Sequence, residues 1–530
     1  MNKETKTESA IPLDDEQIRQ FICDGILVIH SDEDTGFHQS IRDKIERIHR
    51  NGGDTGNNIL PQVPDLQRVL DAPAISGAMQ GVLGENYMQY PHRILVPSEP
   101  LTPEQRNIEL RGDEDGPPMG EGSQSYSYWH KDTYPPLGRA RYHVPRFLFL
   151  FYFPQDTPAE MGPTRMIPGT HYQDQLAKED HAHAYVPDHI KAGSCVLASF
   201  DIEHAGMSNR TDQTRYMVKF VFRRTEEPLR PSWNGGADDW RPPGSHLGRF
   251  ENNETWSYVW DWMRGHERTA VEPAKDIDSH IGKLNGTDQK QRLAAIYSLG
   301  AMGEAALGPL LESLLSVAGK NHIKPPYRQK ADGSIEAIGD SMDRRWTEGG
   351  YIFRDEAFAL GCLGDLAVDP LIELLDHDDP WIVINAAFAL SQIGSRAARA
   401  MQRLAMLLAS PDHRVVRAVL EAIACIGSNT IAAWPALKKL LQTKRDAWEQ
   451  DLELDYLVGD QIHLNAVDAI LQSDLEIEHI EALLIDLLEK PAAFSHVPAT
   501  AAEILLRRGS PIGRRQALQY LQAESRDKID

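Results

Sequence analysis

The second half of the chain contains four short segments that each end in glycine and recur at a nearly constant spacing. They are LGAMG ending at Gly303, LGCLG at Gly364, LSQIG at Gly394 and IACIG at Gly427. The last three glycines are 30 and 33 residues apart, and the first gap of 61 residues is about two periods. Each glycine closes one amphipathic helix and precedes a second. Helix pairs of this period cannot bury their apolar faces alone, so we expect them to stack into an all-α solenoid.

These segments resemble HEAT-like repeats, in which A-x-x-A-L-G-x-[IL]-G is followed by P-L-x-x-L-L. The resemblance covers residues 288–442 and weakens beyond them, where residues 454–521 are predicted to be helical, as degenerate repeats or as a cap. We therefore expect a HEAT-like repeat domain over 287–525, with an insertion at about 318–350. Helical repeats form concave binding surfaces, so this domain could bind a protein partner, self-associate or close a pocket.

Residues 1–270 are rich in proline, aromatic residues and short β-type runs, and a linker at 271–286 is expected to follow them. A helix capped by Asp14 or Asp15 is predicted in LDDEQIRQFICDGILVIH, before a turn into a strand. The predicted strands are Ile26–Ile29, Phe147–Phe153, Ser194–Phe200 and Arg215–Arg223. The unbroken apolar run of the second strand is typical of a strand covered on both faces. This order indicates an α+β sandwich or barrel buttressed by N-terminal helices.

The composition is that of a globular protein, with 530 residues, of which 41% are hydrophobic and 25% charged. A net charge of −23 repels phosphate backbones and anionic lipid, so we expect neither a nucleic-acid nor a membrane partner. The four cysteines form no CxxC pair, which argues against a disulfide framework or a thiolate zinc site. The polar N-terminus lacks the apolar stretch of a secretory signal, and the expected location is the cytoplasm.

The segment YSYWHKD places a histidine and an aspartate two positions apart, at His130 and Asp132. Residues i and i+2 of a strand point to the same face, so these side chains would project together. An imidazole, a carboxylate and one further histidine form the facial triad that binds non-haem Fe(II) and leaves positions open for O2 and a chelating oxo-acid. Zinc sites more often use thiolates or three imidazoles. His-x-Asp alone is a frequent chance pattern, which by itself indicates only a surface pair.

The segment SCVLASFDIEHAGMSNRTDQTRYMVKF supplies a further histidine and a cation. It has the pattern of a hairpin with its turn near Asn209 and Arg210. In that register, residues whose numbers sum to 419 face each other, which pairs His204 with Arg215 at about 5 Å between their Cβ atoms. A guanidinium binds a carboxylate through two parallel hydrogen bonds and stays charged at any working pH. We therefore expect His204 to complete the triad and Arg215 to hold 2-oxoglutarate; by spacing alone, Arg215 would be a surface residue.

In chain order, the pieces LDDEQIRQFICDGILVIH, WHKD, GPTRMIPGTH, AGSCVLASF and H-x-x-x-x-N-x-x-x-x-x-R resemble the phytanoyl-CoA dioxygenase family of Fe(II)/2-oxoglutarate oxygenases. The resemblance implies a double-stranded β-helix, or jelly roll, with the iron on His130, Asp132 and His204. It implies that Arg215 binds the C5 carboxylate of 2-oxoglutarate. It also places Thr164 beside the co-substrate, although this residue could merely serve the turn that follows it.

The implied reaction is hydroxylation of a small-molecule substrate, with Fe(II) and O2, and with release of succinate and CO2. Relatives that halogenate replace the carboxylate ligand with a small residue, so the presence of Asp132 disfavours halogenation. Desaturation and ring closure stay open because the same iron site supports them. Two alternatives are a scaffold, in which the HEAT-like half binds a partner beside an inactive jelly roll, and a cupin-type metal enzyme that does not use 2-oxoglutarate.

Residues close to the metal motif are candidates for the substrate pocket. Tyr126 and Tyr128 would share the face of the metal motif's histidine in a regular strand, whereas Trp129 would point away from it into the core. His92 and Arg93 lie in a predicted upstream strand and could face either substrate or the protein interior.

Two further features lie outside the predicted triad. The segment 99–122 is long, charged and rich in glycine and proline, and it is a candidate substrate lid. Four histidines in and near the HAHA sequence are expected to be solvated loop residues rather than a second metal site. They are His171, His181, His183 and His189.

Overall fold

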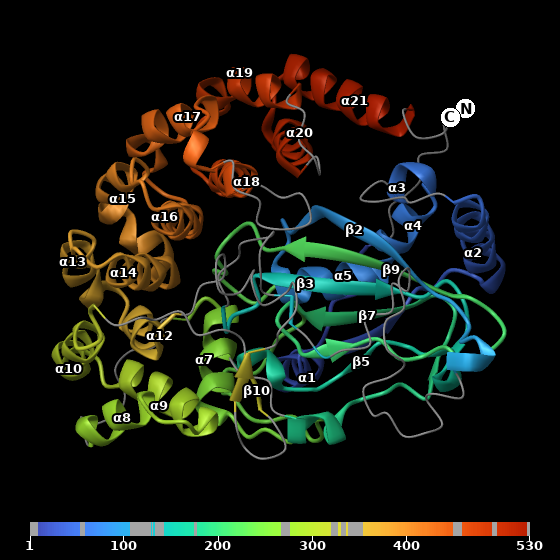
Figure 1. The fold of residues 1–530 in the computed structure, drawn as a ribbon, viewed down its shortest axis with the longest axis horizontal. Coiled ribbons are helices and arrows are strands. Elements are labelled where there is room, and N and C mark those ends of the chain that lie inside the picture. The colour runs from blue at the N-terminus through green and yellow to red at the C-terminus, as the bar shows by residue number, and fades with distance from the viewer. Residues whose placement is uncertain are drawn as a thin grey trace.

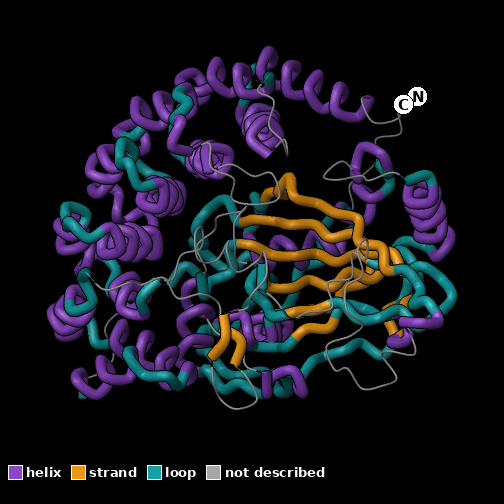
Figure 2. The backbone as a smooth tube through the Cα atoms, viewed as in Figure 1, coloured by secondary structure: helices purple, strands orange, loops and turns teal. Residues whose placement is uncertain are grey.

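A computed structural model shows a β-rich first half around which the helices of the second half curve in an arc (Figures 1 and 2). It describes residues 9–52, 59–105, 129, 131–132, 142–173, 178–266, 276–319, 327–329, 335–337, 353–448, 458–489 and 496–526. No helix in these ranges is both long and apolar enough to cross a membrane.

The first half is built on an antiparallel sheet of five strands. In spatial order these are β1 (Ile26–His30), β7 (Ser194–Ser199), β3 (Phe147–Tyr152), β9 (Arg215–Arg223) and β2 (Met88–Ser98). Every residue of the central strand β3 is buried, which confirms the prediction from its apolar run. Two short antiparallel pairs accompany this sheet: β4 (Thr157–Pro158) with β6 (His189–Ile190), and β5 (Arg165–Met166) with β8 (His204–Ala205).

The N-terminal helix starts and stops where its sequence predicts. The side chain of Asp14 accepts a hydrogen bond from the backbone N–H of Gln17, whose own side chain accepts from the N–H of Asp14. This reciprocal cap begins α1 (Asp15–Asp24). Gly25 ends the helix with a φ of 71°, and a Cβ there would lie 2.6 Å from a ring nitrogen of His171. The chain can therefore turn directly from α1 into β1 only with glycine at this position.

Helices cover one face of the five-stranded sheet. They are α2 (Thr35–Arg50), α3 (Ile59–Gln62), α4 (Leu66–Leu70) and α5 (Pro73–Leu83). Helix α5 contacts β1 and α2 contacts β9. His38 of α2 lies 2.8 Å from the hydroxyl oxygen of Tyr152 of β3. The prediction of N-terminal buttressing helices is confirmed. Three 3-10 turns complete this half, at Ala159–Met161, Thr170–Tyr172 and Lys178–His183.

The second half consists of helix pairs arranged as an inner and an outer row (Figure 1). The inner row is α9 (Gln289–Ala301), α12 (Asp355–Cys362), α14 (Pro380–Ile393), α16 (His413–Ile426), α18 (Val458–Leu471) and α20 (His496–Arg508). The outer row is α8 (Ile277–Leu284), α10 (Glu304–Leu315), α13 (Asp365–Leu374), α15 (Met401–Leu407), α17 (Trp434–Gln442), α19 (Ile477–Leu488) and α21 (Pro511–Arg526). Short 3-10 turns precede or follow some of them, at Gly394–Ala400, Thr430–Ala432 and Asp446–Trp448.

The repeated glycines lie at the corners between paired helices. Gly303, Gly364, Gly394 and Gly427 have φ values of 61°, 60°, 68° and 59°. At the first three, ψ is −138°, −132° and −143°, a backbone region that is essentially restricted to glycine. This restriction explains why the period is visible in the sequence as glycine.

Two expectations about the second half need adjustment. The segment expected as a linker is in part helical, because α8 packs against α9 and α10. Residues 454–521 contribute α18 to α21, whose pairs continue the inner and outer rows. Most of the predicted insertion lies outside the described residues; within it, β10 (Tyr327–Gln329) pairs with β11 (Ile335–Ala337).

A tryptophan-rich helix joins the two halves. Helix α7 (Asn253–Met263) contacts both α1 and α9. Its Trp256 and Trp260 are fully buried, and the ring of Trp233 lies 5.5 Å from that of Trp260. These tryptophans pack on the side of the first half, where Arg19 of α1 lies over the ring of Trp260, whereas Tyr258 of α7 meets Tyr297 of α9 at 4.6 Å between ring centroids.

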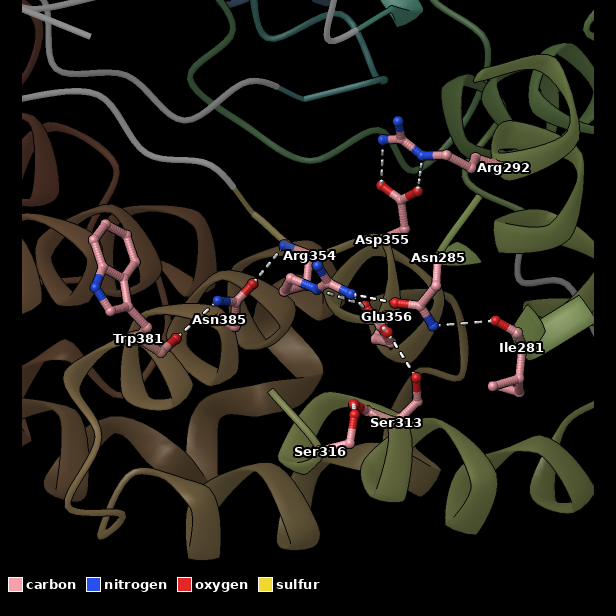
Figure 3. Close-up of polar contacts among 10 residues, drawn as sticks. All are labelled: Ile281, Asn285, Arg292, Ser313, Ser316, Arg354, Asp355, Glu356, Trp381 and Asn385. Carbon is pink, nitrogen blue, oxygen red and sulfur yellow. Dashed lines mark hydrogen bonds and ion pairs between the residues drawn. The ribbon is translucent and has the colours of Figure 1, made fainter. Parts of the chain in front are cut away.

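A buried polar network ties five helices together where the chain returns from the insertion (Figure 3). Arg292 of α9 binds Asp355 of α12 through two hydrogen bonds of 2.7 and 3.2 Å. The buried carboxylate of Glu356 accepts a hydrogen bond of 2.7 Å from the hydroxyl of Ser313 of α10. The Arg354 side chain reaches Asn285 after α8, and its backbone N–H binds Asn385 of α14.

We expect Asp355→Ala to lower the free energy of unfolding by about 3 kcal/mol, because it leaves the buried guanidinium of Arg292 without its bidentate partner. Urea denaturation of the full chain measures this change. The matched control is Asp365→Ala, which removes an exposed partner of Arg399 and should leave the transition where it is. Equal effects of the two substitutions would contradict the role assigned to burial.

Candidate functional site

His204 lies on β8, opposite Met166 of β5, and only 4% of its surface is exposed. Its ring packs against the rings of Phe149 and Phe151 of β3, at 5.9 and 6.2 Å between centroids. The Nδ1 atom is 3.0 Å from the carbonyl oxygen of Ile202. Because a carbonyl only accepts, Nδ1 carries a proton, so the neutral ring presents its lone pair at Nε2, the form in which an imidazole binds a metal.

Asp132 brings a carboxylate to this lone pair. The side chain is 6% exposed, and its Oδ2 atom lies 3.6 Å from Nε2 of His204. Imidazole nitrogens and carboxylate oxygens bind divalent metals at about 2.0–2.2 Å, so two donors at this separation can share one ion. The pair fits two legs of the predicted triad.

Arg215 is the first residue of β9 and lies opposite Ser98 of β2. It is 3% exposed, and burial lowers the pKa of its guanidinium to about 10, so that the group stays cationic at neutral pH. Its Nε and Nη1 atoms have no hydrogen-bond partner among the residues that the structure describes. A buried cation with unmatched donors is costly unless a ligand supplies the acceptors. The position therefore fits a carboxylate-binding residue.

Lys219 is a site residue that our reading of the sequence missed. Its ammonium forms an ion pair with the carboxylate of Asp132 and lies 4.1 Å from the centre of the Phe149 ring. Residues 215, 217 and 219 of a strand point to one face, so Lys219 and Arg215 lie on the same side of the sheet. The alternation of side chains along this strand, counted from Arg215, is the sequence signal that could have placed Lys219 on the same face.

The hairpin that predicted a pairing of His204 with Arg215 is wrong. Strand β8 pairs with β5, whereas β9 pairs with β2 and β3. The side chain of Asn209 donates to the carbonyl oxygens of Ser98 and Gln213, at 2.8 and 2.7 Å. The segment between β8 and β9 thus passes from the short β5–β8 pair to the five-stranded sheet, and it does not form a hairpin. Sheet packing places both residues on the same side of the long sheet, since His204 contacts Phe149 and Phe151 of β3 on the face that carries Lys219.

The remaining predicted site residues have different outcomes. Thr164 is buried directly before β5, the strand next to that of His204. Arg93 lies opposite Phe220, on the sheet face away from Lys219, and its ionisable neighbours Glu503 and Tyr520 are on the C-terminal helices α20 and α21. Of the two directions that the sequence left open, the structure thus favours the one away from the proposed metal ligands, because one position in a strand reverses the face.

Other predictions fall on residues that are not described. These are the roles of His130, Tyr126, Tyr128 and the side chain of His92, together with residues 106–122 of the candidate lid. Within the described residues, no three histidine, cysteine, aspartate or glutamate side chains gather as a metal site. His204 and Asp132 contribute two of the three ligands of the proposed triad, and the third lies outside the described ranges.

Lys131, between the two predicted ligands of the metal motif, has its ammonium enclosed by backbone carbonyls. Its Nζ atom donates to the carbonyl oxygens of Thr170, Gln173 and Asp201. The carboxylate of Asp201 lies 3.7 Å from Nζ, and the side chain of Lys131 is 5% exposed. A buried ammonium bound by this many acceptors fixes the position of the backbone of its own residue. We call these three carbonyls, with the Asp201 carboxylate, the Lys131 cage.

The neighbouring histidines differ from expectation. His183 and His189 are exposed, as predicted, but His171 is buried, and burial together with the charge of Lys131 lowers its pKa to about 3. His181 lies 3.0 Å from the buried carboxylate of Glu203 and stacks on Trp129, with ring centroids 4.8 Å apart.

Trp129 is only partly buried, and the guanidinium of Arg165 of β5 lies over its ring, 4.6 Å from the ring centre. The expectation of a core tryptophan is therefore wrong. Instead, Trp129 belongs to a polar and aromatic wall beside the metal motif.

Two family models match separate parts of the chain. Residues 117–217 match the model described as phytanoyl-CoA dioxygenase (PhyH), and residues 357–424 match the model described as HEAT repeats. The chain therefore carries a PhyH-type region followed by HEAT repeats, which confirms both resemblances seen in the sequence.

Individual proteins match more weakly. Phycocyanobilin lyase subunit alpha from Picosynechococcus sp. is 32% identical over 158 residues, covering 24% of this chain and 58% of that protein. The α-ketoglutarate-dependent carbocyclase SnoK from nogalamycin biosynthesis is 16% identical, with a TM-score of 0.31, over 40% of this chain and 85% of that one. EctD from S. alaskensis, solved with 2-oxoglutarate and 5-hydroxyectoine, is 14% identical, with a TM-score of 0.31, over 44% of this chain and 88% of that one.

Proposed function

We propose that this chain is an Fe(II)- and 2-oxoglutarate-dependent dioxygenase that hydroxylates a small molecule, with release of succinate and CO2. The observation that carries the proposal is the convergence of three buried groups in the PhyH-type region. The metal-binding nitrogen of His204 faces the carboxylate of Asp132, and the guanidinium of Arg215 lies on the same sheet face with unmatched donors. A metal and a dicarboxylate together would satisfy all three groups.

In this proposal His130, Asp132 and His204 hold the iron. When bound, iron and 2-oxoglutarate together with O2 supply the oxidising power that attacks a carbon–hydrogen bond. The Nδ1 hydrogen bond to Ile202 keeps His204 in the metal-binding tautomer. Phe149 and Phe151 cover this imidazole and exclude water from its side of the site.

Arg215 binds the C5 carboxylate of 2-oxoglutarate, with Thr164 beside it. A planar guanidinium would fix the direction of this carboxylate as well as its position, so Arg215 would orient the co-substrate as well as bind it. The presence of Asp132 favours hydroxylation over halogenation. The residues holding the metal would equally serve desaturation or cyclisation, and the substrate decides among these outcomes.

The proposal extends to the architecture. We assign the five-stranded sheet and the short pairs β4–β6 and β5–β8 to a double-stranded β-helix within residues 1–270, and residues 287–525 to the repeat domain. The contact of β8 with the inner face of β3 supports this assignment, because a jelly roll buries its site between two sheets.

The proposed function is tested by adding Fe(II) and 2-oxoglutarate to the protein without oxygen and recording the visible spectrum. A charge-transfer band that needs both components supports the dioxygenase. Metal binding without such a band, and without succinate formation in metabolite extracts under air, favours the cupin-type alternative. Absence of metal binding favours the scaffold.

A further inference from the structure

The segment that follows the metal motif is held by the helical half of the chain. Tyr142 points its hydroxyl at Ser391 of α14 and at Glu421 and Cys425 of α16, at distances of 3.2, 3.4 and 3.4 Å. Its ring lies 5.5 Å from that of Phe388 of α14. Residues 142–151 are buried without interruption, although the first five of them form no regular element. Their fixed position therefore depends on these contacts.

The next residue, His143, makes two close contacts with other inner helices. Its Nδ1 atom is 2.6 Å from the hydroxyl of Tyr297 of α9. Its ring stacks on Phe358 of α12, with centroids 4.3 Å apart and planes at 12°. Tyr142 and His143 together thus engage one inner helix from each of four successive pairs.

A chain of described contacts leads from His143 to the metal motif. The ring of His143 meets the ring of Tyr172 edge to face at 5.9 Å. Tyr172 is the last residue of a turn that begins at Thr170. The carbonyl oxygens of Thr170 and of Gln173, which follows the turn, are two members of the Lys131 cage. Lys131 is the immediate neighbour of Asp132. The inner helices are therefore linked to the metal ligands through one aromatic contact and one buried ammonium.

The rest of the inner row also contacts the β-rich half. Asp468 of α18 is fully buried and binds Arg223 at the end of β9, at 2.9 Å. Arg507 of α20 donates to the carbonyl oxygens of Asn86 and Tyr87, both at 2.9 Å. Along this row, the concave side that solenoids usually offer to a partner is occupied by the chain's own first half (Figure 1).

We propose that the helical half is an internal clamp that positions the metal ligands, acting through His143 and the Lys131 cage. This inference rests on the proposed function for the identity of the ligands. It assigns Tyr297, Phe358 and His143 as positioning residues, none of which touches the metal or the co-substrate. A protein partner, if one binds the repeats, would then use the outer row.

The test compares Tyr297→Phe, and the double variant Tyr297→Phe with Phe358→Leu, with the control Arg507→Met. The control removes two contacts between the same halves but none on the His143 route. Co(II) affinity is measured by titration of the full chain without oxygen, and hydrogen exchange is followed in peptides covering residues 129–146. We expect the double variant to bind Co(II) about tenfold more weakly, the lower end of the range for lost outer-shell partners. Exchange in these peptides should rise.

The single variant should show the same changes to a smaller degree, and the control should leave both readouts as in the parent protein. Unchanged Co(II) affinity and unchanged exchange in the double variant overturn the clamp, as would an equal loss in the control. If Co(II) binding by the parent protein does not require Asp132, the proposed function fails instead. The clamp is then decided by hydrogen exchange alone, with faster exchange in the double variant supporting it and unchanged exchange overturning it.

Discussion

Arg215→Ala is expected to raise the concentration of 2-oxoglutarate needed for half-maximal turnover by about 30-fold or more, since truncating one partner of a buried charge pair costs roughly 2–5 kcal/mol. The physical reason is the position of the guanidinium, which is 3% exposed and has two donors that no described residue satisfies. Succinate formation at varied 2-oxoglutarate gives the KM, and titration without oxygen gives the Kd.

Two companion variants separate ligand binding from a structural role. Arg215→Lys keeps the charge but loses the planar fork, so its KM should fall between those of the parent and the alanine variant. Arg215→Met removes a buried charge without breaking a described hydrogen bond, so it should leave the ligand-free protein at least as stable as the parent. A large loss of stability together with an unchanged KM would show that Arg215 is structural.

Asp132→Ala is expected to weaken divalent metal binding by more than about 100-fold, because loss of an outer-shell partner alone costs about 10- to 100-fold. Turnover should be lost with the metal. Titration with Co(II) in the absence of oxygen measures the affinity directly, without dependence on the substrate. The control is Asp156→Ala, which removes an exposed carboxylate in the same half.

The ion pair of Asp132 with Lys219 adds a second readout. Removing the carboxylate alone leaves a partly buried ammonium without this partner, so Asp132→Ala should also reduce stability. Adding Lys219→Met should restore stability but not metal binding. Restoration of both, or full Co(II) affinity in Asp132→Ala, would remove this residue from the proposed metal site.

The repeats show how far local patterns extend. Amphipathic spacing and the recurring glycines predicted helix pairs, and the structure confirms them because each pair depends on its own apolar face and on a corner that needs glycine. Nothing in that pattern indicates which way the rows curve or what they enclose. The buried pair of Arg223 with Asp468 joins residues 245 positions apart, and no local signal marks either as a partner of the other.

The candidate site likewise has some features that local patterns predicted and others that they did not. The bounds of the strand Arg215–Arg223 are as predicted. The two-residue period also singled out Asp132 with His130, but Trp129, Lys131 and Asp132 form no strand and His130 lies outside the described residues. The sequence left the direction of Arg93 open, and a β-bulge between Gln89 and Arg93 interrupts a simple count along this strand. The surroundings of Trp129 and His181 were predicted wrongly because the residues that they contact, Arg165 and Glu203, lie in other segments of the chain.

The sequence alone therefore determined the two kinds of architecture, their order, and the residue types of the proposed metal and dicarboxylate site. These properties depend on periodicity and on the chemistry of single side chains, both of which are local. Only the tertiary structure decided that β8 packs against β3, that Lys131 and Lys219 support the metal motif, and that the repeats enclose their own chain. These are contacts between segments that are distant in the sequence, and they depend on how buried surfaces pack and how buried charges pair. The glycine period of the repeats carries no information about them.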